Sequence, residues 1–260
     1  MISSSQQKYL ASLHIKKFRQ KYRKFLVEGE KMVAELLTLN ASPDPRVPVD
    51  AIYGTERWAA QNEALLRPFY DKFNIATGQE LKKAGTLTTP NEVMAVAQLP
   101  SPAPAQQPIS SGEFYLYLDA IQDPGNMGTI LRIADWFGIR QVWCAKGCVD
   151  VFNPKTVQSG MGACLRVNTI EDADIQEIIR QNPNLPLIGT VMDGSNLFSS
   201  DKPSGGLVVI GNEGKGIRPE ILPLLTHRYT IPKGSGSEAE SLNAGVATGI
   251  VLGVLLQNAL

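Results

Sequence analysis

Short apolar runs in the C-terminal part of the chain predict strands. They occupy residues 114–121, 142–145, 186–192 and 206–212. The last two are almost continuously apolar, which is typical of strands in a parallel sheet, because both faces of such a sheet are covered. We expect a further strand around Leu165.

Segments with helical spacing of apolar residues lie between these runs. The spacing predicts helices over 126–138, after Asn153 and Pro154, over 172–181 and from Ser241 to the end of the chain. Asn126 is expected to cap the first helix and Gly138 to end it. Strands that alternate with helices predict an α/β fold with a mostly parallel sheet, in which ligands bind beyond the carboxyl ends of the strands.

The N-terminal part shows a less regular alternation. It predicts a strand that turns into a helix over 25–31, a helical stretch from Trp58 to Phe69, and strands over 49–55, 73–77 and 93–99. Together these elements indicate a small α/β domain.

A proline-rich stretch separates the two parts. Residues 98–113 contain four prolines and few residues that could fill a core, which is typical of an extended linker. The sequence therefore predicts a small α/β domain over residues 1–99, a linker over 100–112 and a second α/β domain over 113–260.

The apolar run at residues 244–256 is the candidate for a membrane span. Its 13 residues are fewer than the roughly 20 that a bilayer requires. Gly245, Gly249 and Gly253 recur every four residues, so one helix face is nearly bare backbone. This spacing favours a buried helix packed closely against its neighbours.

Cysteine and histidine are scarce. Three cysteines, Cys144, Cys148 and Cys164, are too few for a disulfide framework, and no leader-like segment opens the chain. We therefore expect a cytoplasmic protein with reduced thiols. The two histidines, His14 and His227, argue against a histidine-based metal site or triad. A zinc site at Cys144 and Cys148 would require further ligands, so we expect no metal.

Charge is unevenly distributed along a chain whose net charge is zero. Residues 1–99 contain 14 Lys and Arg against 10 Asp and Glu, a difference of +4. Residues 100–260 contain 11 against 15, a difference of −4. The N-terminal part is therefore the better candidate for contact with a polyanion.

The positive charge is concentrated at the start of the chain. Seven cations precede the first acidic residue, Glu28, and are interleaved with Tyr9, Phe18, Tyr22 and Phe25. Such a segment either contacts the phosphates of a nucleic acid or forms a solvated basic helix face. The candidate RNA-contacting residues are Lys16, Lys17, Arg19, Lys21, Arg23 and Lys24.

Three loops that follow strands are rich in Gly, Asn and Ser, at residues 119–132, 210–217 and 231–243. They match neither the GxGxxG dinucleotide motif nor the GxxxxGK[ST] phosphate-binding motif. Their candidate site residues are Asn126, Arg132, Asn212, Glu213, Ser241 and Asn243. These groups orient, neutralise and donate hydrogen bonds, which suits a reaction whose driving force lies in a cofactor.

The three loops together resemble a known family. PGNMGTILRIADWFGI, VVIGNEGKGI and IPKGSGSEAESLNAGVATGI are similar, in order and spacing, to the three motifs of the SpoU–TrmH family of RNA ribose 2′-O-methyltransferases, in the knotted SPOUT superfamily. KYRKFLVEGEKMVAELL, residues 21–37, resembles the N-terminal substrate-binding domain of family members that act on ribosomal RNA, a small α/β module like a ribosomal protein.

This resemblance implies a trefoil-knotted catalytic domain and a homodimer whose active sites form across the interface. It implies that S-adenosylmethionine is held largely by backbone groups near Thr190, Gly211, Ile231 and Leu242. The implied activity is ribose 2′-O-methylation, with ribosomal RNA favoured over transfer RNA because the N-terminal domain is separate and basic. A non-catalytic RNA-binding assembly factor with the same fold is the alternative.

The resemblance makes Arg132 the central catalytic residue near the 2′-hydroxyl. A guanidinium is in practice always protonated, which disfavours a general-base role. We therefore expect Arg132 to stabilise the developing 2′-oxyanion and to contact the adjacent phosphate. Asn126, Ser241 and Asn243 would orient the hydroxyl and the methyl donor, and Glu213 would position its neighbours.

Overall fold

The chain forms two compact units in the computed structural model, which describes residues 2–87, 91–101, 109, 110 and 112–257. The first unit comprises Met1–Pro102 and Phe152–Leu165, and the second comprises Ala103–Val151 and Arg166–Leu260. The segment Phe152–Leu165, which the sequence pattern places in the second domain, thus packs in the first unit. Most of the predicted linker lies outside the described residues.

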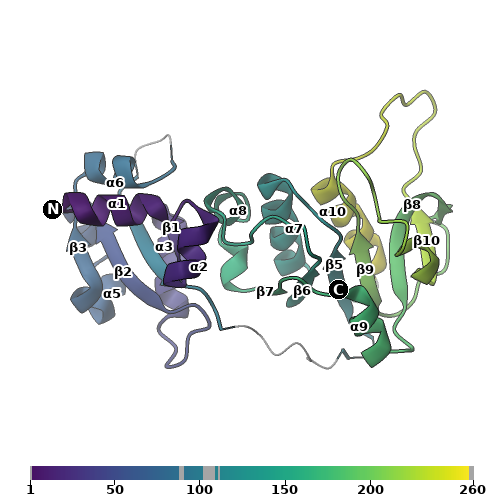
Figure 1. The fold of residues 1–260 in the computed structure, drawn as a ribbon, viewed down its shortest axis with the longest axis horizontal. Helices are drawn as coiled ribbons and strands as arrows, with labels where there is room; N and C mark the ends of the chain where they lie inside the picture. The colour runs from purple at the N-terminus through teal and green to yellow at the C-terminus, as the bar shows by residue number, and fades with distance from the viewer. Residues whose placement is uncertain (1, 88–90, 102–108, 111, 258–260) are drawn as a thin grey trace. The chain divides into compact units, whose positions relative to one another are not determined.

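The described part of the first unit contains a four-stranded sheet in the order β1-β4-β2-β3 (Figure 1). Its strands are β1 (Lys24–Glu28), β2 (Val49–Gly54), β3 (Phe73–Ile75) and β4 (Val93–Gln98). The central strand β4 is antiparallel to both of its neighbours, whereas β2 and β3 are parallel. All side chains of β4 except that of its last residue, Gln98, are buried, because helices cover the sheet on both faces.

Helices of the first unit supply the rest of its core. They are α1 (Ser4–Ser12), α2 (Lys16–Tyr22), α3 (Glu30–Leu39), α4 (Glu56–Gln61), α5 (Glu63–Leu66), α6 (Gly78–Ala84) and α8 (Pro154–Ser159), with 3₁₀ turns η1 (Arg67–Lys72) and η2 (Ala163–Leu165). The buried side of α3 carries Met32, Val33, Leu36 and Leu37. The predicted strand-to-helix turn and its apolar helix face are therefore confirmed.

The described part of the second unit contains a six-stranded, wholly parallel sheet in the order β10-β8-β9-β5-β6-β7. The strands are β5 (Phe114–Leu118), β6 (Gln141–Cys144), β7 (Asn168–Ile170), β8 (Leu187–Asn196), β9 (Gly206–Ile210) and β10 (His227–Thr230), with a short turn η3 (Leu222–Leu224) before β10. The parallel α/β fold predicted from the apolar runs is thus confirmed.

Helices cover the faces of the parallel sheet. Helix α9 (Ile175–Gln181) packs its Ile175 and Ile178 on a cluster of strand residues that includes Tyr117 and Trp143. Helices α7 (Pro124–Trp136) and α10 (Ala244–Leu255) lie against each other (Figure 1).

The contact between α7 and α10 is closest at Gly245. A Cβ atom there would lie 2.7 Å from Cγ2 of Thr129, so any larger residue would force Thr129 to shift. Cβ atoms added at Gly249 and Gly253 would lie 3.6 Å from Ile133 and 3.8 Å from Phe137, which are ordinary van der Waals distances. The prediction of a closely packed helix is confirmed for this side of α10, whereas Val246 on another side is exposed. Among the described residues, no helix is long and apolar enough to cross a membrane.

Several boundaries differ from the sequence prediction; for example, α9 begins at Ile175, three residues later than predicted. Helix α7 begins at Pro124 with Asp123 as its cap, so Asn126 is not the cap; Gly138, at φ 72°, ends the helix as expected. Helix α10 starts three residues after Ser241, because the side chain of Asn243 caps it. The segment around Leu165 is a 3₁₀ turn, and strand β7 follows it.

Candidate active site

The three glycine-rich loops of the second unit are joined by a chain of side-chain hydrogen bonds. Asn243 donates from Nδ2 to Oδ1 of Asn126 at 2.6 Å. Asn126 in turn donates from Nδ2 to Oε1 of Glu213 at 3.0 Å. These residues lie up to 117 positions apart in the sequence. The two hydrogen bonds therefore join one residue from each of the three predicted motifs. We call Asn243, Asn126 and Glu213 the amide–carboxylate relay.

Asn243 is fixed at one end of this relay by its role as a helix cap. Its Oδ1 accepts hydrogen bonds from the backbone N–H groups of Gly245 at 2.9 Å and Val246 at 3.2 Å. With its oxygen committed to the helix, the amide can only donate toward Asn126. The direction of the relay therefore follows from the start of α10.

Glu213 ends the relay as an acceptor surrounded by donors. Besides Asn126, the backbone N–H groups of Gln122 and Asp123 lie 3.4 Å from its carboxylate, and Nδ2 of Asn212 lies 3.3 Å away. Burial raises the pKa of Glu213, but the hydrogen bonds from Asn126 and the backbone outweigh burial and lower it below its usual value. Glu213 is therefore ionised at neutral pH and can organise groups around itself.

Asn212 shapes the loop that carries Glu213. Its Nδ2 donates to the carbonyl of Ala120 at 2.7 Å, and its Oδ1 accepts from the N–H groups of Gly214 and Lys215 at 3.0 and 3.1 Å. The preceding Gly211 passes so close to the returning chain that a Cβ atom would lie 2.4 Å from the carbonyl carbon of Gly216. A glycine is thus required where the loop folds back on itself.

Arg132 lies less than two turns after Asn126 on α7 and its side chain is exposed. Among the described residues, no hydrogen bond or ion pair to its guanidinium is found. Ser241 and Leu242 are also exposed, in the loop before α10. The structure thus gathers Asn126, Glu213 and Asn243 but leaves Arg132 and Ser241 open to solvent.

Three of the four predicted cofactor-binding residues lie in or directly after neighbouring strands. Thr190 lies in β8, Gly211 directly follows β9, and Ile231 directly follows β10. The pairing of β10 with β8 jumps from Gly189 to Ser195, so residues 190–194 stand outside the ladder. Backbone groups at such carboxyl-terminal ends fit a nucleoside whose contacts are mainly with the main chain.

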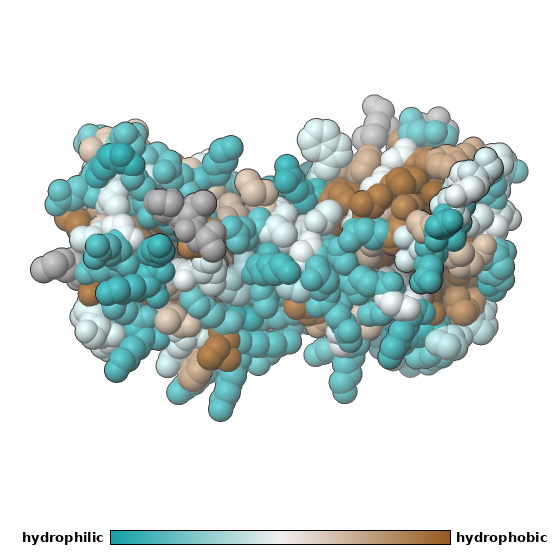
Figure 2. Space-filling model, turned by 90° about the horizontal axis from the view of Figure 1, so that it is seen from above, coloured by the Kyte–Doolittle hydropathy of each residue, from teal (hydrophilic) through white to brown (hydrophobic). Residues whose placement is uncertain are grey.

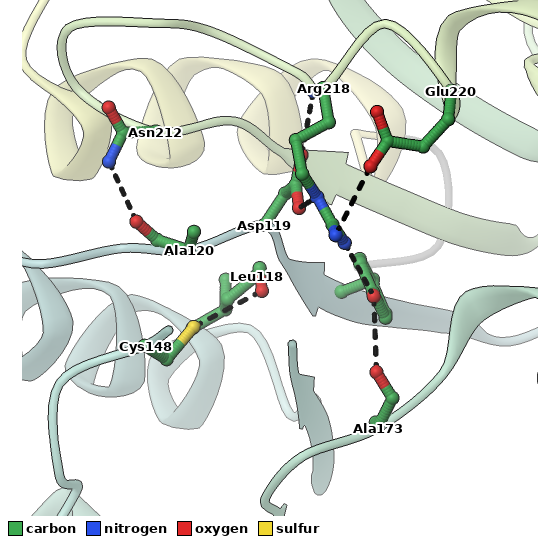
Figure 3. A network of polar contacts seen from close by, with 9 residues as sticks. Leu118, Asp119, Ala120, Cys148, Ala173, Asn212, Arg218 and Glu220 are labelled. Atoms are coloured by element: carbon green, nitrogen blue, oxygen red, sulfur yellow. Dashed lines mark hydrogen bonds and ion pairs between the residues drawn. The ribbon is translucent and has the colours of Figure 1, made fainter. Parts of the chain in front are cut away.

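An ion pair that the sequence does not predict, between Asp119 and Arg218, anchors the chain that follows the Glu213 loop (Figure 3). Asp119 is fully buried at the end of β5. Its carboxylate accepts from the backbone N–H of Arg218 at 2.8 Å and from Nε of the same residue at 2.5 Å. The sequence offers one signal, an acid directly after a buried strand, but its partner lies 99 positions away.

The candidate RNA-contacting residues of the first unit have different surroundings. Lys16, Lys17 and Lys21 are exposed. Arg19 is only 2% exposed and donates from Nη1 to the carbonyl of Leu13, so it stabilises the helix pair and is not available to a phosphate. Arg23 and Lys24 are engaged by the Pro100 carbonyl and Asp50, respectively, at 2.8 and 2.7 Å.

Replacing Glu213 by Gln is expected to impair the site almost as much as removing the side chain. Every group around the carboxylate is a donor, so the new NH₂ group would face N–H groups. Hydrogen bonds to a charged group contribute about 1.5–3 kcal/mol, so catalysis should fall on the order of 10- to 100-fold. Initial rates of the methyl transfer that the resemblance implies measure this change.

Glu177→Gln is the matched control, because Glu177 is a partly exposed glutamate of the same unit, and it should leave the rate unchanged. The ionised form of Glu213 is favoured in the folded protein, so its stabilising contribution is present above the unfolded pKa of about 4.3. Glu213 no longer stabilises the folded protein once the pH has fallen through its folded-state pKa, which is lower than the unfolded one. A Glu213→Gln enzyme with wild-type rates would contradict the relay.

Comparison with known proteins supports the reading of the three motifs. Residues 113–253 match the model of the SpoU rRNA methylase family, and residues 5–95 match an MRM3-like substrate-binding domain. The 23S rRNA (guanosine(2553)-2′-O)-methyltransferase RlmP of Bacillus subtilis is 28% identical over 251 residues, covering 92% of this chain and 91% of that protein.

Two solved structures are similar over nearly the whole chain. One, from Porphyromonas gingivalis and assigned to the TrmH family of RNA methyltransferases, has 36% identity and a TM-score of 0.80, with 99% of each chain covered. Another, an rRNA methyltransferase from Sinorhizobium meliloti with AdoMet bound, has 25% identity and a TM-score of 0.85, covering 100% of this chain and 98% of that one. The family match spans more than half of the sequence and contains every residue of the relay, and on this basis the chain belongs to the SpoU rRNA methylase family.

Proposed function

We propose that this protein transfers the methyl group of S-adenosylmethionine to a ribose 2′-hydroxyl in ribosomal RNA. The observation that carries the proposal is the amide–carboxylate relay, in which Asn243, Asn126 and Glu213 join the three family motifs. A protein that only bound RNA would not require this arrangement. The similarity to the RlmP enzyme of Bacillus subtilis supports ribosomal RNA over transfer RNA.

The methyl donor supplies an activated methyl group, so the chain must align the hydroxyl and stabilise charge. Arg132 is exposed and bears a fixed positive charge, which suits it to stabilise the developing 2′-oxyanion and contact the adjacent phosphate. Asn126 and Asn243 are held in single orientations by the relay and position the reacting groups together with Ser241.

The cofactor would be held by the main chain around Thr190, Gly211, Ile231 and Leu242. The unpaired bulge at residues 190–194 and the tight turn at Gly211 support this placement, since both leave backbone groups at the carboxyl ends of adjacent strands. A trefoil knot is part of the proposal. It is supported by the resemblance of the three motifs to those of the knotted SPOUT superfamily.

We propose a homodimer that uses the outer sides of α7 and α10. Val246 is 51% exposed and Trp136 82% exposed, while Ile250 and Val254 continue the stripe on α10 at intervals of four residues. Figure 2 shows hydrophobic side chains gathered over the part of the second unit that contains α10. Contiguous exposed apolar surface of this kind marks an interface.

Arg132 lies one helical turn before Trp136 and therefore on the same side of α7. This position supports an active site that forms across the dimer interface, because an exposed arginine with no partner among the described residues can complete a site that lies next to the contact.

Replacing Trp136 by Glu is expected to convert the dimer into a monomer. The side chain is exposed in the single chain, so its replacement leaves the protomer folded while it places a charge in the interface. Sedimentation velocity measures the change. Tyr70→Glu alters an exposed aromatic residue of the first unit and should remain dimeric. A monomeric wild-type protein would refute the proposed dimer.

The exposed lysines of α2, Lys16, Lys17 and Lys21, form the proposed RNA surface of the first unit, and Arg23 adds charge at the end of that helix. The match to an MRM3-like substrate-binding domain supports this role. A cytoplasmic location is also proposed and agrees with the lack of a disulfide among Cys144, Cys148 and Cys164. No group of three or more potential metal ligands occurs within the described part of the chain.

The test is transfer of labelled methyl from S-adenosylmethionine to ribosomal RNA, transfer RNA and ribosomal subunits, each offered separately. Digestion of the product identifies the labelled nucleoside and shows whether the ribose carries the label. Label on a ribose of ribosomal RNA, free or in the subunit, supports the proposal. Label only on transfer RNA would overturn the substrate assignment. Absence of both transfer and cofactor binding would favour a non-catalytic RNA-binding protein.

A further inference from the structure

We propose that Tyr22 is a stacking platform for an unpaired RNA base, beside the lysines of α2 that contact its phosphates. The inference rests on the proposed action on RNA and adds the kind of nucleotide that the first unit holds, namely an unstacked, single-stranded one.

The position of Tyr22 leaves its ring accessible. Helix α2 ends at this residue, because Arg23 adopts a left-handed conformation with φ 55°. No further helical turn follows to cover the ring, and the residue is 37% exposed although its side chain is large and aromatic. The backbone after it is held in place by the bond of 2.8 Å between Nη2 of Arg23 and the carbonyl of Pro100.

The ring is also held in a defined orientation. Tyr9 packs against it edge-on with ring centroids 5.3 Å apart, and Phe18 lies nearly parallel to it at 6.2 Å. Aromatic neighbours in these arrangements fix a ring without enclosing it. A base that stacks on Tyr22 would therefore meet a surface that is already ordered, which lowers the entropy cost of binding.

The charge around the ring matches a nucleotide. The ammonium group of Lys21 lies 5.5 Å from the ring centroid, in a cation–π contact. Lys16 and Lys17 are exposed on the same short helix, and the chain contains no acidic residue before Glu28. When RNA binds, Lys21 can exchange the ring for a phosphate, which leaves the ring face to the base.

These features favour single-stranded RNA over a duplex. Bases within an A-form helix are stacked on one another and their faces are not available, whereas loops and bulges present them to aromatic side chains. Stacking on an aromatic residue does not depend on base identity, so the platform adds affinity with little sequence preference.

The test measures binding of the full-length protein to a fluorescent single-stranded oligoadenylate and to an RNA duplex of equal length. Tyr22→Leu keeps an apolar side chain against Tyr9 and Phe18 but removes the aromatic ring. We expect it to weaken oligoadenylate binding about 5- to 100-fold. Tyr22→Phe should retain wild-type affinity, and neither variant should change duplex binding.

Salt dependence separates stacking from charge. Lys21→Gln should lower the slope of log affinity against log salt by about 0.7, the value for one phosphate contact on a single strand. Tyr22→Leu should leave that slope unchanged. Tyr70→Ala is the matched control, because Tyr70 is a more exposed tyrosine of the same unit outside the basic segment, and it should bind normally.

Wild-type affinity in Tyr22→Leu, or no oligoadenylate binding by the wild-type protein, would overturn the platform. A thermal melt of each variant shows whether a loss of affinity reflects unfolding, and Tyr22→Phe reports the ring itself. The binding assay uses no methyl donor, so it can fail while methyl transfer to ribosomal RNA succeeds, and the reverse also holds.

Discussion

Arg132→Ala is expected to lower methyl transfer by two to three orders of magnitude, because removal of one donor to a developing oxyanion costs about 2.7–4 kcal/mol. The side chain is exposed and α7 packs through other residues. Alanine also has the highest helix propensity, so the fold and the cofactor affinity should be unchanged. Single-turnover rates together with calorimetric titration of S-adenosylmethionine distinguish loss of chemistry from loss of binding.

Arg132→Lys tests what the guanidinium contributes beyond its charge. Lysine keeps the charge but cannot make two parallel hydrogen bonds to oxyanion and phosphate, so partial activity is expected. Arg140→Ala, at an exposed arginine of the same unit, is the matched control. Near-normal turnover in Arg132→Lys would exclude a specific guanidinium role.

Arg218→Ala should lower the free energy of unfolding by about 1–3 kcal/mol, because it removes the charged partner of the buried carboxylate of Asp119. The side chain of Arg218 is 41% exposed, so water can enter where it is truncated, and the backbone N–H of residue 218 still donates to the carboxylate; both limit the loss. The loop that carries Glu213 would also lose its anchor, and methyl transfer should fall with stability. Urea denaturation measures the first effect.

A double-mutant cycle made of Asp119→Asn, Arg218→Met and the double variant isolates the ion pair from the packing of the loop. The double variant removes both charges and should be less destabilised than Arg218→Met alone. Arg180→Ala, at an exposed pair with Glu177, should change stability by less than about 1 kcal/mol. If Arg218→Ala behaved like Arg180→Ala, the buried pair would have no role in holding the loop.

Much of the second unit is predictable from sequence because its strands are short and fully apolar. A continuously apolar strand such as that predicted over 206–212 is stable only in a sheet covered on both faces, and β9 lies fully buried in such a sheet. The boundary of α7 was also within reach: Pro124 suits the first turn of a helix, and Asp123 before it is a good cap. Asn126 has equal capping propensity, so propensity alone does not choose between them.

Other features depend on contacts that no local pattern encodes. The basic segment predicts a charged surface, but only the fold shows that Arg19 points inward to the carbonyl of Leu13. The three motifs predict that Asn126, Glu213 and Asn243 meet, whereas the direction of each amide follows from which atom caps α10. The partner of Asp119 lies 99 positions away, beyond any periodicity.

The glycine contact between α7 and α10 sets a limit on how the active site can tolerate change. Asn243 caps the start of α10 and also donates to Asn126 on α7. The position of its side-chain amide therefore depends on the distance between the axes of the two helices. A methyl group at Gly245 would separate those helices at the end nearest the relay. Substitutions in the first turn of this apolar helix are therefore constrained by the geometry of the relay as well as by packing.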